Sequence, residues 1–65
     1  MMRFNIPGMT CGGCARSIIA VIQAMDGKAR VEADLSAKHV GVESRVGRDA
    51  LVAAIREAGY EAYPA

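Results

Sequence analysis

The chain has 65 residues, of which 52% are hydrophobic and 23% charged, and its formal net charge is +1. A chain this short buries one small core, so we expect a single folded domain over residues 1–65 and no large enclosed active site. There is no run of Lys or Arg, and no apolar stretch approaches the roughly twenty residues that cross a bilayer, so we expect neither a nucleic-acid partner nor membrane insertion.

A strand and a helix are predicted in the first half of the chain. Residues 2–7 alternate apolar and polar side chains, with Phe4 and Ile6 on one face, as in a half-buried strand that a Pro-Gly pair then ends. Over residues 14–25 apolar side chains recur at three- and four-residue spacings before an Asp-Gly stop, which predicts an amphipathic helix. Its apolar positions are Ile18, Val21, Ile22 and Met25.

A hairpin is predicted next. Apolar and charged residues alternate over residues 30–35, break at residues 36–38, and alternate again around Val40 and Val42, which predicts two strands with one buried face. The inward positions of the first of these strands are Val31, Ala33 and Leu35.

The last predicted elements are a helix over residues 47–58 and a short strand over residues 60–63. Gly59 is placed to cap the helix, and Pro64 is expected to keep the strand from extending. The apolar helix positions are Leu51, Ala54, Ile55 and Ala58.

This order of elements predicts an α+β fold. Two amphipathic helices and four strands with one apolar face each are accommodated by the ferredoxin-like βαββαβ arrangement, a four-stranded antiparallel sheet with both helices on one face. In that fold the loop before the first helix, the turn at residues 36–38 and the turn at Gly59 lie at the same end of the sheet.

Both cysteines, Cys11 and Cys14, lie in the glycine-rich loop that joins the first strand to the first helix. Two Cys separated by two residues can direct both sulfurs to one point, and thiolates bind soft metals such as Cu(I) and Zn(II). The same spacing also occurs in redox disulfides. Gly12 and Gly13 carry no side chains between the sulfurs, so the loop can bend and leave the thiols accessible.

The start of a helix near Cys14 favours its thiolate, because unpaired N–H groups and the positive end of the helix dipole lie there. The first residues lack the apolar segment of a secretory signal, so we expect a cytoplasmic protein. In that reducing compartment a resting structural disulfide is not expected, which favours metal binding or transient redox work for the two thiols.

The run GMTCGGC from Gly8 to Cys14 resembles the GMTCxxC signature of heavy-metal-associated domains. The similarity extends over nearly the whole chain, through the Val-x-Val hairpin to the closing Ala58-Gly59-Tyr60. It implies a small copper chaperone of bacterial type, or the similar metal-binding domain of a copper-transporting P-type ATPase, with Cu(I) held by Cys11 and Cys14.

The resemblance also implies roles for the residues around the two ligands. Met9 is implied to be a core residue that tethers the loop, which agrees with its use as a flexible core filler. Tyr60 is implied to lie near the metal, as in bacterial members, where many eukaryotic members have lysine. The remaining implied neighbours of the metal are Thr10, Gly12 and Gly13.

We therefore expect a monomeric Cu(I) carrier without enzymatic activity, which delivers its ion to the metal-binding domain of a copper-transporting P-type ATPase. A copper-bridged homodimer stays open. Two Cys and one His, His39, are too few for a closed four-ligand zinc site, and His39 is expected to face solvent. The alternatives are a carrier of mercury or zinc, and a thiol-disulfide redox protein, although the chain is short for a thioredoxin-type fold.

Overall fold

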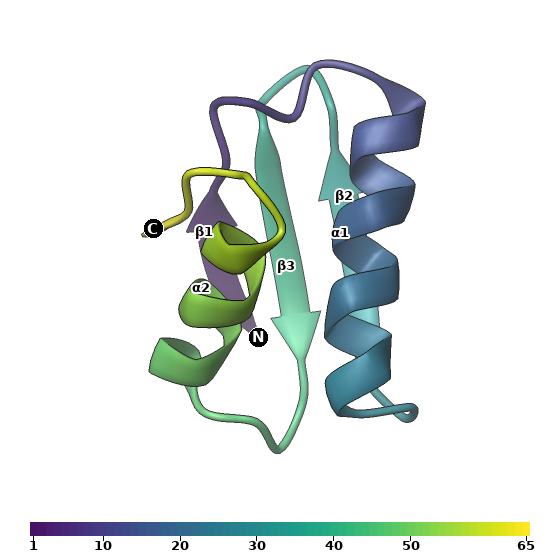
Figure 1. The fold of residues 1–65 in the computed structure, drawn as a ribbon, viewed down its shortest axis with the longest axis vertical. Coiled ribbons are helices and arrows are strands. Elements are labelled where there is room, and N and C mark those ends of the chain that lie inside the picture. Colours follow the sequence, from purple (N-terminus) through teal and green to yellow (C-terminus); the bar gives the residue numbers. More distant parts are fainter.

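The computed structural model describes all residues from 1 to 65 and shows two layers, a sheet and a pair of helices that cover one of its faces (Figure 1). The elements in chain order are β1 (Met2–Asn5), α1 (Gly12–Met25), β2 (Arg30–Asp34), β3 (His39–Glu43), α2 (Arg48–Glu57) and β4 (Tyr63–Pro64). All strand pairs are antiparallel, and the strand order is β2-β3-β1-β4. The predicted ferredoxin-like fold is thus confirmed. None of its helices is long and apolar enough to cross a membrane.

The core fills the space between the sheet and the helices. Alternation along β1 and β3 turns Phe4, Val40 and Val42 toward the helices, and Phe4 is the direct partner of Val40 in the sheet. Every side chain of this core is apolar, which leaves no buried polar atom without a partner. Its twelve members are Phe4, Ile6, Met9, Ala15, Ile18, Ile22, Ala29, Val40, Val42, Leu51, Ile55 and Ala62.

The loop that carries the cysteines is fixed to the sheet end by backbone hydrogen bonds. The N–H of Ile6 donates to the carbonyl of Lys38 at 2.8 Å, and the N–H of Met9 donates to the carbonyl of Ile6 at 3.0 Å. The Met9 side chain is fully buried in the core. This loop and the β2–β3 turn lie together at the upper end of Figure 1, as the fold predicted.

Four positions predicted to face the core are exposed. Ala33 and Leu35 belong to the edge of the sheet, because β2 is its outermost strand and Leu35 lies one residue beyond it, in the turn. Met25 and Ala58 lie at or just past the last turns of their helices, where the core tapers. Amphipathic periodicity gives the buried face of an element but not the point at which the core ends.

Most elements have a boundary one to three residues from the predicted one, and two of these differences have a clear cause. Helix α1 begins at Gly12, two residues before the expected start, since Cys11 already caps it. Strand β4 is Tyr63–Pro64, so it begins three residues later than predicted and includes Pro64. Because β4 is an edge strand, it tolerates a residue without an N–H, and pairing continues past it through the N–H of Ala65, which donates to the carbonyl of Arg3 at 2.9 Å.

Candidate metal centre

The two thiols lie side by side at the N-terminus of α1. Cys11 is the N-cap residue and Cys14 lies in the first turn, so one helical turn brings their sulfur atoms to 3.1 Å from each other. Both are free cysteines; Cys11 is exposed and Cys14 is half-buried. The predicted pair therefore forms one site that a partner can reach from solvent.

The same turn of helix makes Cys11 part of the cap. Its backbone is extended, with φ −150° and ψ 166°, and its sulfur accepts a hydrogen bond from the N–H of Cys14 at 3.4 Å. Its carbonyl accepts the first helical hydrogen bond, from the N–H of Ala15 at 3.1 Å. The Cys11 sulfur therefore takes the place of a capping oxygen, at the positive end of the helix dipole.

The surroundings of Cys14 favour its thiolate. The pKa of this thiol falls from its ordinary 9.0 to about 7, chiefly through the hydrogen bond with the Cys11 side chain and then through the Thr10 backbone and the Tyr60 hydroxyl. A thiol with that pKa is about half ionised at neutral pH, and the thiolate is the form that binds metals.

Tyr60 approaches the pair from the loop after α2. Its ring is half-buried, and a methyl group placed on Gly8 would lie 3.7 Å from its Cδ1 atom. The pKa of Tyr60 is raised, first by the hydrogen bond with Cys14 and then by burial of the hydroxyl. The phenol therefore stays protonated and serves as a donor to the thiolate.

The other residues predicted around the metal differ in their surroundings. Met9 is fully buried beneath the loop, whereas Thr10, Gly12 and Gly13 are exposed. A methyl group on Gly13 would lie 3.8 Å from the Cys11 sulfur, and one on Gly12 would meet nothing within 4 Å. The outer side of the loop is therefore open.

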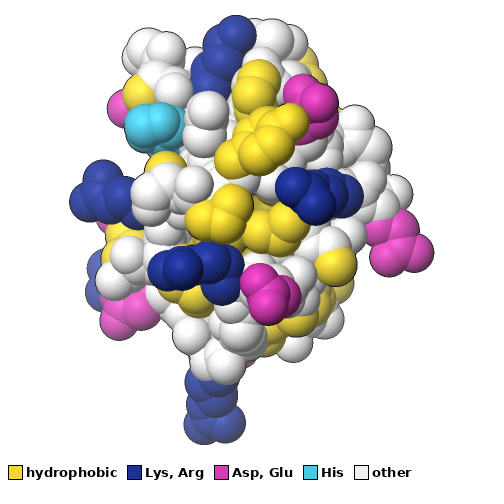
Figure 2. Space-filling view, turned by 90° about the vertical axis from the view of Figure 1, so that its left-hand side faces the viewer, with side chains coloured by type: hydrophobic (Ala, Val, Ile, Leu, Met, Phe, Trp, Pro, Cys, Tyr) yellow, Lys and Arg dark blue, Asp and Glu magenta, His cyan; other side chains and the backbone are white.

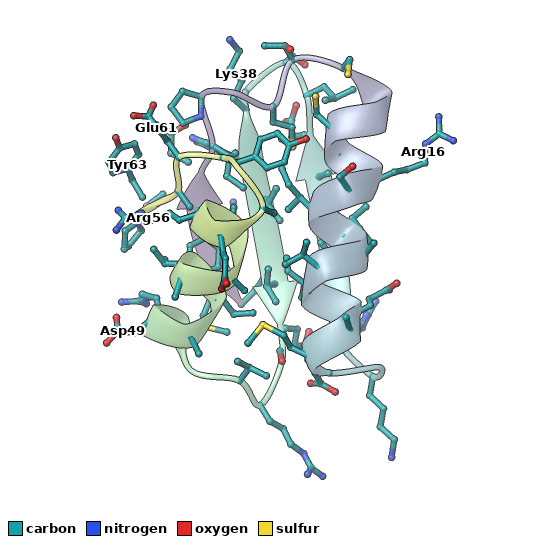
Figure 3. The ribbon with its side chains drawn as sticks, in the orientation of Figure 1. Arg16, Lys38, Asp49, Arg56, Glu61 and Tyr63 are labelled. Carbon is teal, nitrogen blue, oxygen red and sulfur yellow. The ribbon has the colours of Figure 1, made fainter.

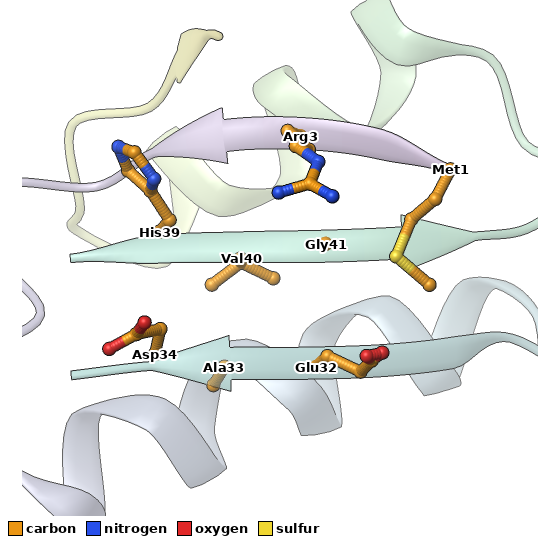
Figure 4. A pocket seen from close by; sticks show the side chains of 8 residues that line it. All are labelled: Met1, Arg3, Glu32, Ala33, Asp34, His39, Val40 and Gly41. Atoms are coloured by element: carbon orange, nitrogen blue, oxygen red, sulfur yellow. The ribbon is translucent and has the colours of Figure 1, made fainter. Parts of the chain in front are cut away.

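His39 and Arg16 are not brought to the thiols. His39 lies on the sheet face that the helices leave uncovered, beside a hollow of about 210 Å³ that Arg3 and Asp34 also line (Figure 4). Arg16 extends from α1 into solvent (Figure 3). No group of three or more His, Cys, Asp or Glu side chains converges in the structure, so the candidate centre offers two sulfur ligands.

Sequence reasoning did not single out Ser17. Its hydroxyl forms a hydrogen bond with the Tyr60 hydroxyl. This bond lowers the pKa of Tyr60, whereas Cys14 and burial raise it. Ser17 follows Cys14 by three residues, so the two share a face of α1. That spacing is the signal that identifies it as a neighbour of the site.

Comparison with known proteins assigns the chain to a family. The sequence profile of the heavy-metal-associated domain matches residues 3–61, nearly the whole chain. The chain belongs to the heavy-metal-associated domain family. The resemblance noted in the sequence is thus confirmed.

Several relatives of this heavy-metal-associated domain are known. It is 38% identical over 52 residues to the copper transport protein ATOX1 homolog of Dictyostelium discoideum, covering 78% of each chain. Among solved structures, a gold binding protein is 34% identical with a TM-score of 0.97 and full coverage of both chains. The copper chaperone Atx1 from Synechocystis is 33% identical with a TM-score of 0.94, covering 97% of this chain and 100% of the other.

Proposed function

We propose that this domain is a cytoplasmic copper chaperone that carries one Cu(I) ion between Cys11 and Cys14. The observation that carries the proposal is the pair of accessible sulfurs 3.1 Å apart at a helix N-terminus. Cu(I) is a soft ion that suits thiolate ligands, whereas structural zinc sites take four ligands. The names of the relatives in Dictyostelium and Synechocystis support copper as the cargo.

Loading requires the sulfurs to move apart. Two thiolate–metal bonds of about 2.3 Å, the length typical of zinc, would hold the sulfurs about 4.6 Å apart in a linear site. The sulfurs start 3.1 Å apart. Cys11 is exposed, and Gly12 beside it has nothing within 4 Å of its Cβ position, so the outer ligand has room to swing.

The backbone at the N-terminus of α1 offsets the negative charge of the loaded site. Two thiolates and one Cu(I) carry a net charge of −1, and α1, with 14 residues, presents its N-terminus to them. The N–H of Cys14 is directed at the Cys11 sulfur. Arg16 extends into solvent and is left free for contact with another protein (Figure 3).

Release follows from the same exposure. A thiol of a partner can bind the ion before the bond to Cys11 is lost, so the ion moves without passing through water. We propose that the partner is the similar metal-binding domain of a copper-transporting P-type ATPase, and that the carrier acts as a monomer without catalysis. A homodimer bridged by copper through four cysteines is the alternative assembly.

A second candidate is a carrier of another soft ion. The similarity to a gold binding protein over the full length of both chains favours Au(I) as the competing cargo, and mercury or zinc are further candidates. A thiol-disulfide redox protein is the candidate from another class, because sulfurs 3.1 Å apart need only a small movement to form a disulfide.

The deciding experiment is an anaerobic competition titration of the reduced protein with Cu(I), Au(I) and Zn(II), using chelators of known affinity. One Cu(I) per chain, bound far more tightly than Zn(II) and released to a purified heavy-metal-associated domain, would support the proposal. Preference for Au(I) or Zn(II) would reassign the cargo. Absence of tight binding, together with a reduction potential in the range of thiol-disulfide oxidoreductases, roughly −270 to −120 mV, would support redox work.

A further inference from the structure

Arg56 connects helix α2 to the C-terminal segment at the edge of the sheet. Its guanidinium donates to the carbonyl of Ala62 at 3.1 Å and lies 5.9 Å from the centre of the Tyr63 ring. Figure 3 shows the two side chains meeting on the outer side of α2. The Tyr63 hydroxyl in turn donates to Glu61 at 3.3 Å. One exposed arginine thus contacts two consecutive residues of this segment, Ala62 and Tyr63.

The segment that Arg56 holds is also the one that carries Tyr60. Gly59 turns the chain at the end of α2 with φ +101°, and its N–H donates to the Arg56 carbonyl at 3.0 Å. The N–H of Tyr60 donates to the carbonyl of Ile55 at 3.3 Å, and Ala62 is fully buried. Between these anchors the Tyr60 ring reaches Gly8 in the thiol loop.

We propose that Arg56 is a positioning residue, which holds residues 59–63 so that the Tyr60 side chain rests against the loop carrying Cys11 and Cys14. The proposal rests on the proposed function only in taking those cysteines as the metal ligands. Arg56 contacts neither thiol and acts through Tyr60. The contacts of Arg56 with Ala62 and Tyr63 lie outside the core, since the Arg56 side chain is exposed.

The surface around Arg56 is open. Shallow hollows flank its side chain, one lined with Gly59, Tyr60, Glu61 and Tyr63 and the other with Asp49, Val52, Ala53 and Pro64. Figure 2 shows apolar side chains gathered on this side of the molecule, between cationic ones. Besides the guanidinium, backbone hydrogen bonds, the buried Ala62 methyl and the packing of the Tyr60 ring against the core hold this segment.

The first test measures the position of Tyr60 without metal. Because the ring lies against Gly8, the Gly8 protons should carry a ring-current shift in the NMR spectrum of the reduced protein. Arg56→Met should move this shift most of the way toward its value in Tyr60→Ala, while the methyl signals of Ile18 stay unchanged. Arg56→Lys, which keeps a charge and a donor, should restore most of it. Arg48→Met, at the opposite end of α2, is the matched control.

The second test asks whether Arg56 acts through Tyr60. Arg56→Met and Tyr60→Phe should each change the rate of Cu(I) loss to a chelator in the same direction and by less than about tenfold, below the range typical of outer partners of metal ligands. In the double variant the two changes should not add.

An unchanged Gly8 shift in Arg56→Met, or additive effects in the double variant, would overturn the proposal. If Arg56→Met fails to fold, the same measurements are made on Arg56→Gln, and global loss of structure would assign Arg56 to stability instead. The NMR arm decides the positioning role even if the domain carries no copper.

Discussion

The backbone N–H of Cys14 donates to the sulfur of Cys11, 3.4 Å away, so one candidate metal ligand caps α1 through the N–H of the other. Serine is a favoured N-cap residue, and neither cysteine belongs to the buried core. Cys11→Ser and Cys14→Ser should therefore keep the fold and lose Cu(I) affinity by more than about 100-fold, since loss of outer partners alone costs up to about that much.

Competition with a Cu(I) chelator checks the affinity, and far-UV circular dichroism checks the fold. Copper affinity within a few-fold of the parent in either variant would remove that residue from the site. Ser36→Ala, in the β2–β3 turn, is a control for the loss of a polar side chain at the same end of the sheet.

Tyr60→Phe should bind Cu(I) almost normally. The Tyr60 hydroxyl is only the third cause of the lowered pKa of Cys14, after the Cys11 side chain and the Thr10 backbone. A change in affinity at pH 7 of less than about tenfold, below the range typical of outer partners of metal ligands, is expected. A larger loss in the chelator competition would give the hydroxyl a direct part in holding the ion.

The stability of the reduced protein should rise with pH between about 7 and 9. The pKa of Cys14 is about 7 in the folded chain against 9.0 ordinarily, so the unfolded chain binds more protons in this window and unfolding becomes harder as pH increases. Below pH 7 this contribution is lost. The raised pKa of Tyr60 acts oppositely only as pH passes the ordinary value of 10.0.

Urea unfolding across this window, under anaerobic reducing conditions, measures the effect. In Cys14→Ser the rise should disappear, because the group that titrates is gone. A pH profile identical in the parent and in this variant would show that Cys14 does not couple to folding.

Met9→Ala should destabilise the domain by about 2–5 kcal/mol, because a large fully buried side chain is removed from the core beneath the thiol loop. Met25→Ala is the matched control: Met25 is 41% exposed, and its loss should change stability by no more than about 0.5 kcal/mol. Denaturant midpoints give both values. Equal effects of the two substitutions would contradict the burial of Met9.

Gly59→Ala should destabilise the domain by about 1–2 kcal/mol, because Gly59 has φ +101°, a conformation that disfavours side chains. Gly27→Ala should be neutral or slightly stabilising, since Gly27 lacks positive φ and its Cβ position is open. Thermal unfolding compares the two variants. A Gly59→Ala protein as stable as the parent would mean that the turn before Tyr60 has an alternative conformation.

The order of elements, their type and the inward residues of β1 and β3 were predictable, because each is encoded in local periodicity and turn residues. The exposure of Ala33 and Leu35 was not, since it depends on β2 being the outermost strand. Likewise the inclusion of Pro64 in β4 depends on that strand lying at the opposite edge. Periodicity within a segment carries no information about its neighbours in the sheet.

For the candidate site, spacing and glycine content predicted the proximity of Cys11 and Cys14. The order of elements placed the turn before Tyr60 at the same end of the sheet, and the family resemblance implied that Tyr60 lies near the metal. The contacts of Ser17 and Arg56 were not anticipated, because they depend on how the loop after α2 settles against α1 and β4. Such contacts follow from tertiary packing, which a single sequence does not specify residue by residue.

At the other end of α1, the carboxylate of Asp26 accepts hydrogen bonds from the Ser44 hydroxyl at 2.7 Å and from the N–H of Lys28 at 3.0 Å. A helix of 14 residues places these hydrogen bonds about 20 Å from the thiols. The longest dimension of the molecule is 26 Å. The two thiols therefore lie at one end of the protein, and the hydrogen-bonded Asp26 lies at the opposite end. Lys28 is exposed at the end that carries Asp26. A dye or surface tether attached through Lys28 would leave the thiols facing outward, so that the exchange of ions between single molecules can be observed directly.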